Sequence, residues 1–320
     1  MKKILVTYNM FREGFAELEE KFDVTYPSGD KDMTFEEVMA MIPAYDALCP
    51  MFSFPVNKEL IDRGENLKVV ANYGVGYDNI DVAYCHEKGV VVANTPGATT
   101  EPTANLALAL LLDTARRVTE CDRMLRTLGD KMKVGMLENL GTHVTGATLV
   151  IIGMGRIGKA LCKRARACGM EVIYHDRRRL DVYEETKVGA FYVSMDELLE
   201  KSDFVSLNTP LTPETYHLIG EEALRKMKST AILINTARGP LVDEKALIKA
   251  LQNGEIRGAG LDVFEFNDFP LPELLTLENV VLTPHIGTQT VFSRIEIAKT
   301  VSNNVIGILE GDRPVHIVYH

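Results

Sequence analysis

The 320-residue sequence contains no tryptophan and no apolar stretch approaching the eighteen or so residues that a membrane span requires. Its first residues, Met1-Lys2-Lys3, lead directly into the strand-like run Ile4–Thr7, without the apolar region and small-residue cleavage site of a secretory signal. The sequence therefore predicts a cytoplasmic protein that does not associate with membranes.

Cysteine is scarce and irregularly placed. The five cysteines are odd in number and none is separated from another by only two residues. This distribution argues against a disulfide framework and against a zinc site, and it fits the reduced thiols of a cytoplasmic protein. We therefore expect no bound metal. The cysteines are Cys49, Cys85, Cys121, Cys162 and Cys168.

Positive charge is also in short supply, because 35 basic residues face 45 acidic ones and the net charge is −10. Nucleic acids and anionic membranes attract basic surfaces, so neither is an expected partner. A composition that is 46% hydrophobic and 25% charged is typical of globular proteins. The chain is long enough for about two domains.

The sequence does contain a Gly-x-Gly-x-x-Gly motif at residues 153–158, between the apolar run Ala147–Ile152 and a helix-like stretch that ends at Cys168. Such glycines allow a tight turn, a close approach of backbone to a pyrophosphate, and close packing of helix on strand. The phosphates then lie at a helix N-terminus. A glycine-rich turn without a ligand is the alternative interpretation.

An acidic residue, Asp176, follows the next strand-like run, Glu171–Tyr174. A carboxylate at this place accepts hydrogen bonds from the adenosine ribose, which favours NAD; a plain turn residue is the alternative. Three arginines come directly after it, and arginine side chains can bind the 2′-phosphate of NADP. NAD is therefore the predicted cofactor, with NADP left open by Arg177, Arg178 and Arg179.

Short apolar runs alternate with helical periodicity in two series. This rhythm predicts an α/β protein with two doubly wound parallel-sheet domains. The first series of strand-like runs is Ile4–Thr7, Ala47–Cys49, Lys68–Ala71 and Val90–Ala93, and the second continues after the glycine motif with Phe204–Leu207, Ala231–Ile234, Gly258–Val263 and Val280–Leu282.

Two further segments are predicted to be helical. Glu101–Leu128 has Pro102 in its first turn and the apolar run Leu106–Leu112, so it should be buried between domains or subunits. The stretch Thr290–Gly311 reads as a second helix, and Pro314–Tyr319 after it is expected to return to the first domain.

Three polar residues follow apolar strands of the second series, where ligands of open α/β sheets bind. Arg238 can fork onto a carboxylate and a neighbouring carbonyl oxygen, or simply form a surface salt bridge. His285 is suited to proton transfer near neutral pH, although a structural role is equally open. The third residue is Asn267.

These motifs together resemble the D-isomer-specific 2-hydroxyacid dehydrogenases, which include glyoxylate and hydroxypyruvate reductases, D-lactate dehydrogenases and phosphoglycerate dehydrogenases. The resemblance implies an inserted Rossmann NAD-binding domain, residues 101–289, and a flavodoxin-like discontinuous substrate domain, residues 1–100 plus 290–320. The resemblance also implies a homodimer. The motifs are Asn72–Asp81, Asn94–Gly97, Gly153–Gly158 with Asp176, Pro210–Thr215, Asn235–Gly239, Gly260–Phe264 and Thr283–Gly287.

The resemblance also implies roles for single residues. Arg238 would orient a small 2-oxo acid such as glyoxylate, hydroxypyruvate or pyruvate, and His285 would be the acid/base at its carbonyl oxygen. Backbone N–H groups of Tyr73, Gly74, Val75 and Gly76 would bind the substrate carboxylate, with a plain turn between strand and helix as the alternative. Phe52, in the bulky stretch after the strand ending at Cys49, would line the substrate pocket, with core packing as the alternative. The implied coenzyme-binding residues are Thr103, Gly153, Gly155, Arg156, Ile157, Gly158, Asp176, Thr209, Pro210, Thr215, Thr236, Ala237, Arg238, Asp262, His285 and Gly287.

Asn267 departs from the family pattern, which places a glutamate there beside the histidine. A neutral amide cannot stabilise an imidazolium by charge, so the pKa of His285 should be lower than in relatives, and each unit corresponds to about 1.4 kcal/mol. Asp268 or Glu265 could replace the missing carboxylate. Formate dehydrogenases carry an amide at this place, so a similar activity is an alternative, as is a non-catalytic NAD(H)-sensing interaction protein of the same fold.

Overall fold

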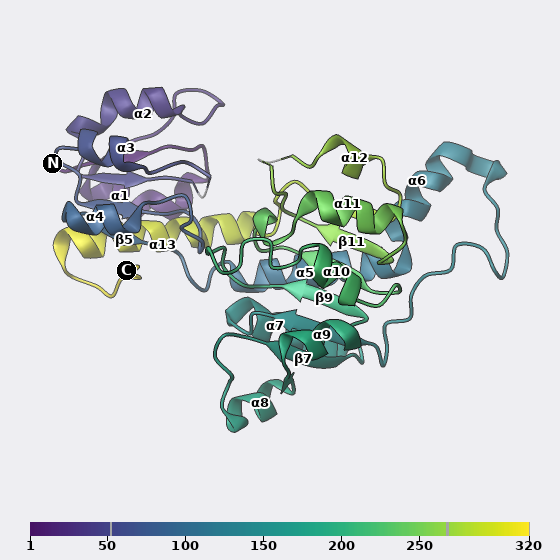
Figure 1. The fold of residues 1–320 in the computed structure, drawn as a ribbon. Coiled ribbons are helices and arrows are strands. Elements are labelled where there is room, and N and C mark those ends of the chain that lie inside the picture. The colour runs from purple at the N-terminus through teal and green to yellow at the C-terminus, as the bar shows by residue number, and fades with distance from the viewer. Residues whose placement is uncertain (52, 267–268, 320) are drawn as a thin grey trace. The chain divides into compact units, whose positions relative to one another are not determined.

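The computed structural model describes residues 1–51, 53–266 and 269–319, and the chain divides into two compact α/β units. Unit 1 combines Met1–Thr99 with Thr288–His320, and unit 2 is Thr100–Gly287. Each unit is built on a sheet of parallel strands (Figure 1). The two parallel sheets predicted from the sequence are confirmed.

Unit 1 contains a five-stranded parallel sheet in the order β2-β1-β3-β4-β5, as in flavodoxin-like folds. Apolar side chains cover both of its faces: Leu5, Leu48 and Val70 belong to one core cluster, while Ile4 and Val69 belong to the other. Burial on both faces explains why the central strands are continuous apolar runs. The strands are β1 (Lys3–Val6), β2 (Asp23–Thr25), β3 (Ala47–Cys49), β4 (Val69–Ala71) and β5 (Val91–Ala93).

Helices pack on both faces of this sheet, and the C-terminal segment completes it. Residues after the last helix run antiparallel to β5, where Val318 donates its N–H to the carbonyl of Val92. The chain therefore returns to unit 1, as expected from the sequence. The helical segments are η1 (Arg12–Phe15), α1 (Ala16–Lys21), α2 (Phe35–Met41), η2 (Ile42–Ala44), α3 (Lys58–Arg63), α4 (Val82–Glu87) and α13 (Val291–Glu310).

Unit 2 contains a seven-stranded parallel sheet in the order β12-β11-β10-β9-β6-β7-β8. The chain order reverses between β6 and β9, and in doubly wound sheets ligands bind beyond the carboxyl ends of the strands at such a point. The strands are β6 (Thr148–Ile152), β7 (Glu171–His175), β8 (Phe191–Tyr192), β9 (Phe204–Leu207), β10 (Ile232–Asn235), β11 (Gly258–Leu261) and β12 (Val280–Leu282).

The predicted helix over 101–128 is two helices, α5 and α6. Arg117 between them adopts a left-handed conformation with φ of 57°, and Asp113 accepts hydrogen bonds from both the N–H and the hydroxyl of Thr119. Only α5 is buried, through residues such as Leu110 and Leu111 in a core cluster of unit 2. The helices of unit 2 are α5 (Thr100–Arg116), α6 (Val118–Leu128), η3 (Gly129–Lys131), α7 (Arg156–Ala167), α8 (Val182–Val188), α9 (Met195–Lys201), α10 (Glu221–Lys226), η4 (Gly239–Leu241), α11 (Glu244–Gln252) and α12 (Pro272–Leu275).

No helix in the described part of the chain is both long enough and apolar enough to traverse a membrane.

Candidate functional site

The glycine motif forms the turn between β6 and α7, and two of its glycines are required by packing. A Cβ atom at Gly153, whose φ is 95°, would lie 2.7 Å from the carbonyl carbon of Asn208, and one at Gly158 would lie 2.2 Å from the carbonyl oxygen of Gly153. A Cβ atom at Gly155 would meet nothing within 4 Å. Gly155 is the N-cap of α7 and no side chain caps this helix. The turn thus leaves open space beside uncapped N–H groups, which suits a phosphate.

Asp176 lies directly after β7 and is tied to the glycine turn, because its Oδ2 accepts the N–H of Met154 at 2.7 Å. All three arginines after it are exposed. The third, Arg179, makes two hydrogen bonds of 2.9 Å to the carboxylate of Glu185, whose side chain is only 8% exposed. The guanidinium holds the pKa of Glu185 below its usual range. Asp176 therefore lies at the strand end, and of the three arginines Arg179 is paired with a buried carboxylate.

The ends of β9 and β10 carry buried polar atoms that lack a hydrogen-bond partner in the described part of the chain. These atoms are Oδ1 of Asn208 and Oγ1 of Thr236. A buried polar group without a partner is costly, and a ligand that supplies one explains it. Beside them, Thr215 accepts the N–H of Thr212 and donates to the carbonyl of Pro210, which shapes the turn after Thr209. Together with the open space at Gly155, these atoms fit a dinucleotide along this edge.

Arg238 begins the turn after β10 and is half-buried. Asn235 holds this turn by donating to the carbonyl of Arg238 at 2.8 Å and accepting the N–H of Ala237 at 3.0 Å. The Arg238 guanidinium donates to the carbonyl of Ala237 at 2.8 Å. Strand β10 therefore positions a cation at the carboxyl edge of the sheet.

Asp262 follows β11, and its carboxylate organises the loop that carries His285. Oδ1 accepts the hydroxyl of Thr283 at 2.6 Å and the N–H of Ile286 at 2.8 Å, and Oδ2 accepts the N–H of Gly287 at 2.9 Å. Burial raises the pKa of Asp262, whereas these donors lower it. Three donors of one loop, residues 283–287, thus hold this side chain.

His285 lies after β12, and its backbone has a positive φ of 53°. Such a conformation costs about 1 kcal/mol or more for a residue other than glycine, and it persists only where the surroundings hold it. Here the N–H of His285 donates to the carbonyl of Asp262 at 2.9 Å. Next to it, a Cβ atom at Gly287 would lie 3.5 Å from Oγ1 of the buried Thr103. The loop is consequently fixed in the conformation that presents the histidine.

In unit 1, the loop over residues 73–76 has three consecutive carbonyls held by hydrogen bonds. The carbonyl of Gly74 accepts the N–H of Thr95, that of Val75 accepts the side-chain amide of Asn94, and that of Gly76 accepts the side-chain amide of Asn72. In a trans peptide the C=O and the following N–H point in opposite directions.

Consequently the N–H groups of Val75, Gly76 and Tyr77 point away from these anchors, which gives the loop donors for an anion. The N–H of Tyr73, expected from the resemblance to bind the substrate carboxylate, donates instead to the carbonyl of Pro50 at 2.9 Å, and its hydroxyl donates to the carbonyl of Arg294.

Three residues named in the sequence analysis, Phe52, Asn267 and Asp268, lie outside the described residues. Glu265, considered as a substitute for Asn267, has both oxygens engaged: Oε1 lies 2.6 Å from Nε2 of His217, and Oε2 accepts the N–H of Glu244 at 2.9 Å. Across residues 1–51, 53–266 and 269–319, no three His, Cys, Asp or Glu side chains form a group that could hold a metal ion.

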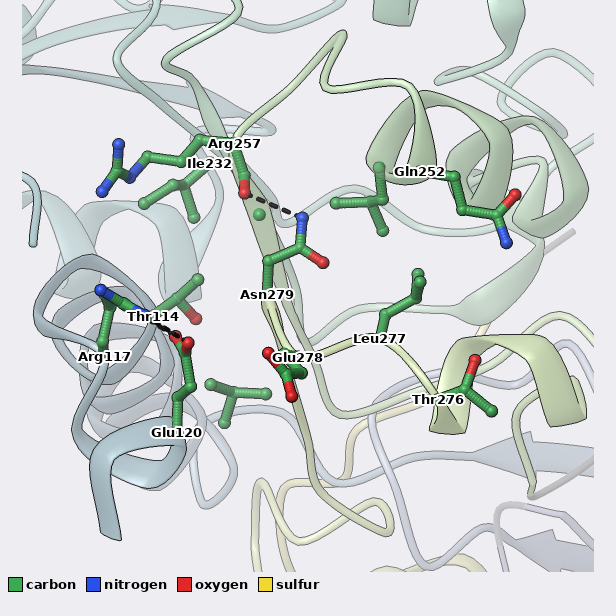
Figure 2. A pocket seen from close by; sticks show the side chains of 13 residues that line it. Thr114, Arg117, Glu120, Ile232, Gln252, Arg257, Thr276, Leu277, Glu278 and Asn279 are labelled. Carbon is green, nitrogen blue, oxygen red and sulfur yellow. Dashed lines mark hydrogen bonds and ion pairs between the residues drawn. The ribbon is translucent and has the colours of Figure 1, made fainter. Parts of the chain in front are cut away.

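A cavity of about 570 Å³ lies at the opposite edge of the unit 2 sheet (Figure 2). Its lining includes Ile232 and Gly258 at the start of β10 and β11, and Asn279 just before β12. Figure 2 shows Arg117 paired with Glu120 on one side of it. The candidate site residues follow the other ends of these strands, so this cavity is separate from them.

The sequence of this chain is similar to that of known proteins, and the similarities point to one family. The sequence model of the "D-isomer specific 2-hydroxyacid dehydrogenase, NAD binding domain" matches residues 108–287. A glyoxylate reductase of Thermococcus litoralis is 45% identical over 320 residues, which cover 99% of this chain and 96% of the relative.

Solved structures agree. An NADPH-dependent glyoxylate/hydroxypyruvate reductase from Sinorhizobium meliloti, crystallised with NADP and malonate, superimposes with a TM-score of 0.87 at 30% identity, covering 99% of this chain and 96% of that one. A D-lactate dehydrogenase from Aquifex aeolicus, crystallised with NAD and lactic acid, has a TM-score of 0.87 at 28% identity, covering 97% and 96%.

Proposed function

The chain belongs to the D-isomer-specific 2-hydroxyacid dehydrogenase family, and from this premise we propose that it reduces a small 2-oxo acid to its D-2-hydroxy acid with NADH. The enzyme class, an NAD(P)-dependent oxidoreductase that acts on 2-hydroxy acids, follows from the membership. Glyoxylate, hydroxypyruvate and pyruvate are the proposed substrates. Glyoxylate comes first, because the name of the 45% identical relative is glyoxylate reductase.

One observation carries the proposal. Arg238 follows β10 and His285 follows β12, on either side of Asp262, which follows β11 between them. Parallel neighbouring strands present their carboxyl ends at one edge. Arg238, a cation that can bind a carboxylate, and His285, an imidazole that can transfer a proton, therefore follow strands that end at the same edge of the sheet as the glycine turn.

Each residue has a defined task in the proposed reaction. The bound nicotinamide supplies the hydride. Arg238 would bind the carboxylate and the carbonyl oxygen of the substrate, and the N–H groups of Val75 and Gly76 would bind the carboxylate as well. His285 would donate a proton to the carbonyl oxygen. Asn267 would orient His285 without adding charge, so reduction should favour lower pH than with a glutamate there.

NADH is the proposed coenzyme in preference to NADPH. Asp176 provides a negative charge at the strand end, where it accepts ribose hydroxyls and repels a 2′-phosphate. Of the three arginines that follow, Arg179 is engaged by Glu185. Both features support NAD.

We also propose that the protein forms a homodimer. Six apolar residues on α6 and in the segment after it expose more than half of their surface. Large exposed apolar patches mark surfaces that contact other proteins, and a second copy of the chain is the proposed partner. These residues are Val118, Leu125, Val134, Met136, Leu137 and Leu140.

The experiment is a coenzyme-binding titration run beside steady-state assays of the three 2-oxo acids, with NADH and with NADPH, from about pH 5 to about pH 8. We expect NADH to bind and at least one acid to be reduced, faster with NADH and at the acidic end. Asn267→Glu should move the alkaline limb of the profile upward.

Absence of turnover on every acid across this pH range would contradict the proposed activity. Tight NADH binding without turnover would instead favour a coenzyme-sensing interaction protein.

A further inference from the structure

Two buried glutamates in unit 2 hold each other's backbone. Glu244, the first residue of α11, accepts the N–H of Glu265 on Oε2 at 2.9 Å, and Glu265 accepts the N–H of Glu244 on its own Oε2 at 2.9 Å. Glu244 is 3% exposed and the side chain of Glu265 is 6% exposed. Buried carboxylates at a helix N-terminus that accept N–H groups are strongly held.

Glu244 also fixes a second point of the same segment, because its Oε1 accepts the N–H of Leu271 at 2.6 Å. One carboxylate thus binds both Glu265 and Leu271, and Asn267 lies between them in the sequence.

The turn of Arg238 presses against the same backbone. A Cβ atom at Gly239 would lie 1.7 Å from the carbonyl oxygen of Phe264 and 2.6 Å from the nitrogen of Glu265. The backbone at Gly239 therefore packs directly against the backbone of residues 264–265. A shift of residues 264–265 would move Gly239, which follows Arg238.

His217 connects a third segment. Its ring Nε2 lies 2.6 Å from Oε1 of Glu265, and its ring Nδ1 lies 3.9 Å from the carboxylate of Asp243. Its backbone N–H donates to the carbonyl of Pro240. Tyr216 stacks on its ring with 4.0 Å between centroids. Residue 215, before this pair, is one of the proposed coenzyme contacts.

We propose that Glu244, acting through Glu265 and His217, is a positioning residue for the reaction: it holds the Arg238 turn and the two ends of the 265–271 segment in the arrangement that reduces the 2-oxo acid. The inference rests on the proposed function and deepens it, since none of these three side chains is among the residues assigned to substrate or coenzyme. Misplacement of a substrate-binding group by about 1 Å can cost about a hundredfold in rate.

The test variant is Glu244→Gln, which has nearly the same shape. A glutamine has one carbonyl oxygen, so either the N–H of Glu265 or that of Leu271 would meet an NH₂ donor instead of an acceptor. We expect kcat/KM for the 2-oxo acid to fall about tenfold or more, with a change in kcat and in the substrate KM, while the Kd for NADH changes less. Glu244→Ala should cost more than Glu244→Gln.

The matched control is Asp203→Asn. Asp203 precedes β9, at the opposite edge of the sheet, where its carboxylate accepts the N–H of Thr148 at 2.9 Å and pairs with Lys228. We expect Asp203→Asn to lower the melting temperature but to leave kcat/KM within about twofold of the wild type. A kcat/KM for Glu244→Gln that also stays within about twofold would overturn the proposal, as would an equal loss in both variants at equal loss of stability.

Hydrogen exchange separates this inference from the proposed activity, because it needs no turnover. In Glu244→Gln we expect faster amide exchange in residues 264–271 and 238–241, and in Asp203→Asn we expect none there. If the wild type reduces 2-oxo acids but exchange and kcat/KM are unchanged in Glu244→Gln, the positioning role is wrong and the function stands. If the wild type shows no turnover, the proposed function is wrong. The exchange result alone then tests whether Glu244 holds residues 264–271 and 238–241 in place.

Discussion

Arg179 is three residues beyond Asp176 in the sequence and has a buried partner. The carboxylate of Glu185 binds it through two hydrogen bonds of 2.9 Å and also accepts the hydroxyl of Tyr174 at 2.8 Å. Because the hydrogen bonds from Arg179 lower the pKa of Glu185 below its usual range, the glutamate is ionised throughout the pH range of the assays and the pair persists there.

Weakening this pair should change the choice of coenzyme. In Glu185→Gln, one oxygen and the negative charge are lost, and Arg179 is released to bind a 2′-phosphate. We expect the ratio of kcat/KM with NADPH to kcat/KM with NADH to rise about threefold to tenfold. The measurement is steady-state kinetics with both coenzymes.

Glu184→Gln on the same helix is the control, because Glu184 pairs with Lys159 and is half-exposed. Its coenzyme ratio should not change. An unchanged ratio in Glu185→Gln would show that Arg179 has no part in coenzyme choice.

At the residue scale, the positions of several proposed site residues could be predicted, because polar residues that follow parallel strands lie at the edge where ligands of such sheets bind. Asp176, Arg238 and His285 lie after β7, β10 and β12, where the sequence predicted them. The hydrogen bonds that the 283–287 loop donates to Asp262, and those that join Glu244 to the backbone of Glu265 and Leu271, could not be predicted. Both depend on which backbone N–H groups the folded chain brings to a carboxylate 21 or more residues away, and no local pattern encodes that.

At the scale of elements, α6 and the segment after it differ from the rest of unit 2. Helix α6 has no buried residue, and Figure 1 shows that α6 and the chain following it extend away from the strands of unit 2. We call residues 118–140 the arm. Met136 and Val134 in it expose 96% and 90% of their surface. An apolar surface of this kind is costly in water and fits burial against a second copy.

We expect the double substitution Met136→Glu with Leu137→Glu to shift the protein from dimer to monomer, because two charges would be buried in the interface. Size-exclusion chromatography with light scattering measures this directly. Val182→Glu is the control, since Val182 on α8 is 73% exposed but lies outside the arm. A monomeric wild type, or a dimer that persists in the double variant, would contradict the assignment of the arm.

The two strands that were not predicted from the sequence share a physical cause. Strand β2 spans three residues and β8 two, both lie at sheet edges, and neither contains a fully buried residue. Edge strands pair on one side only, so they carry little apolar pattern. The division between α5 and α6 was also missed, since it depends on Arg117 and on hydrogen bonds from Thr119 to Asp113 rather than on a proline or glycine.

At the scale of the whole molecule, both sheets could be predicted because the central strands are buried on two faces. Ten apolar runs predicted as strands correspond to strands of the two sheets, with ends that differ by at most two residues: β1, β3, β4, β5, β6, β7, β9, β10, β11 and β12. The relatives support the same architecture along nearly the whole chain, since the matched reductase covers 99% of it. The family and the enzyme class therefore rest on the complete fold rather than on one motif.

We propose that this protein transfers a hydride from NADH to the carbonyl carbon of a 2-oxo acid and forms the D-2-hydroxy acid. The most direct measurement uses NADH carrying deuterium at the transferred position of its nicotinamide, with pyruvate or hydroxypyruvate as acceptor. Mass spectrometry and chiral chromatography then examine the product. We predict a D-2-hydroxy acid with deuterium on C2; an L-product, or a product without deuterium, would contradict the account.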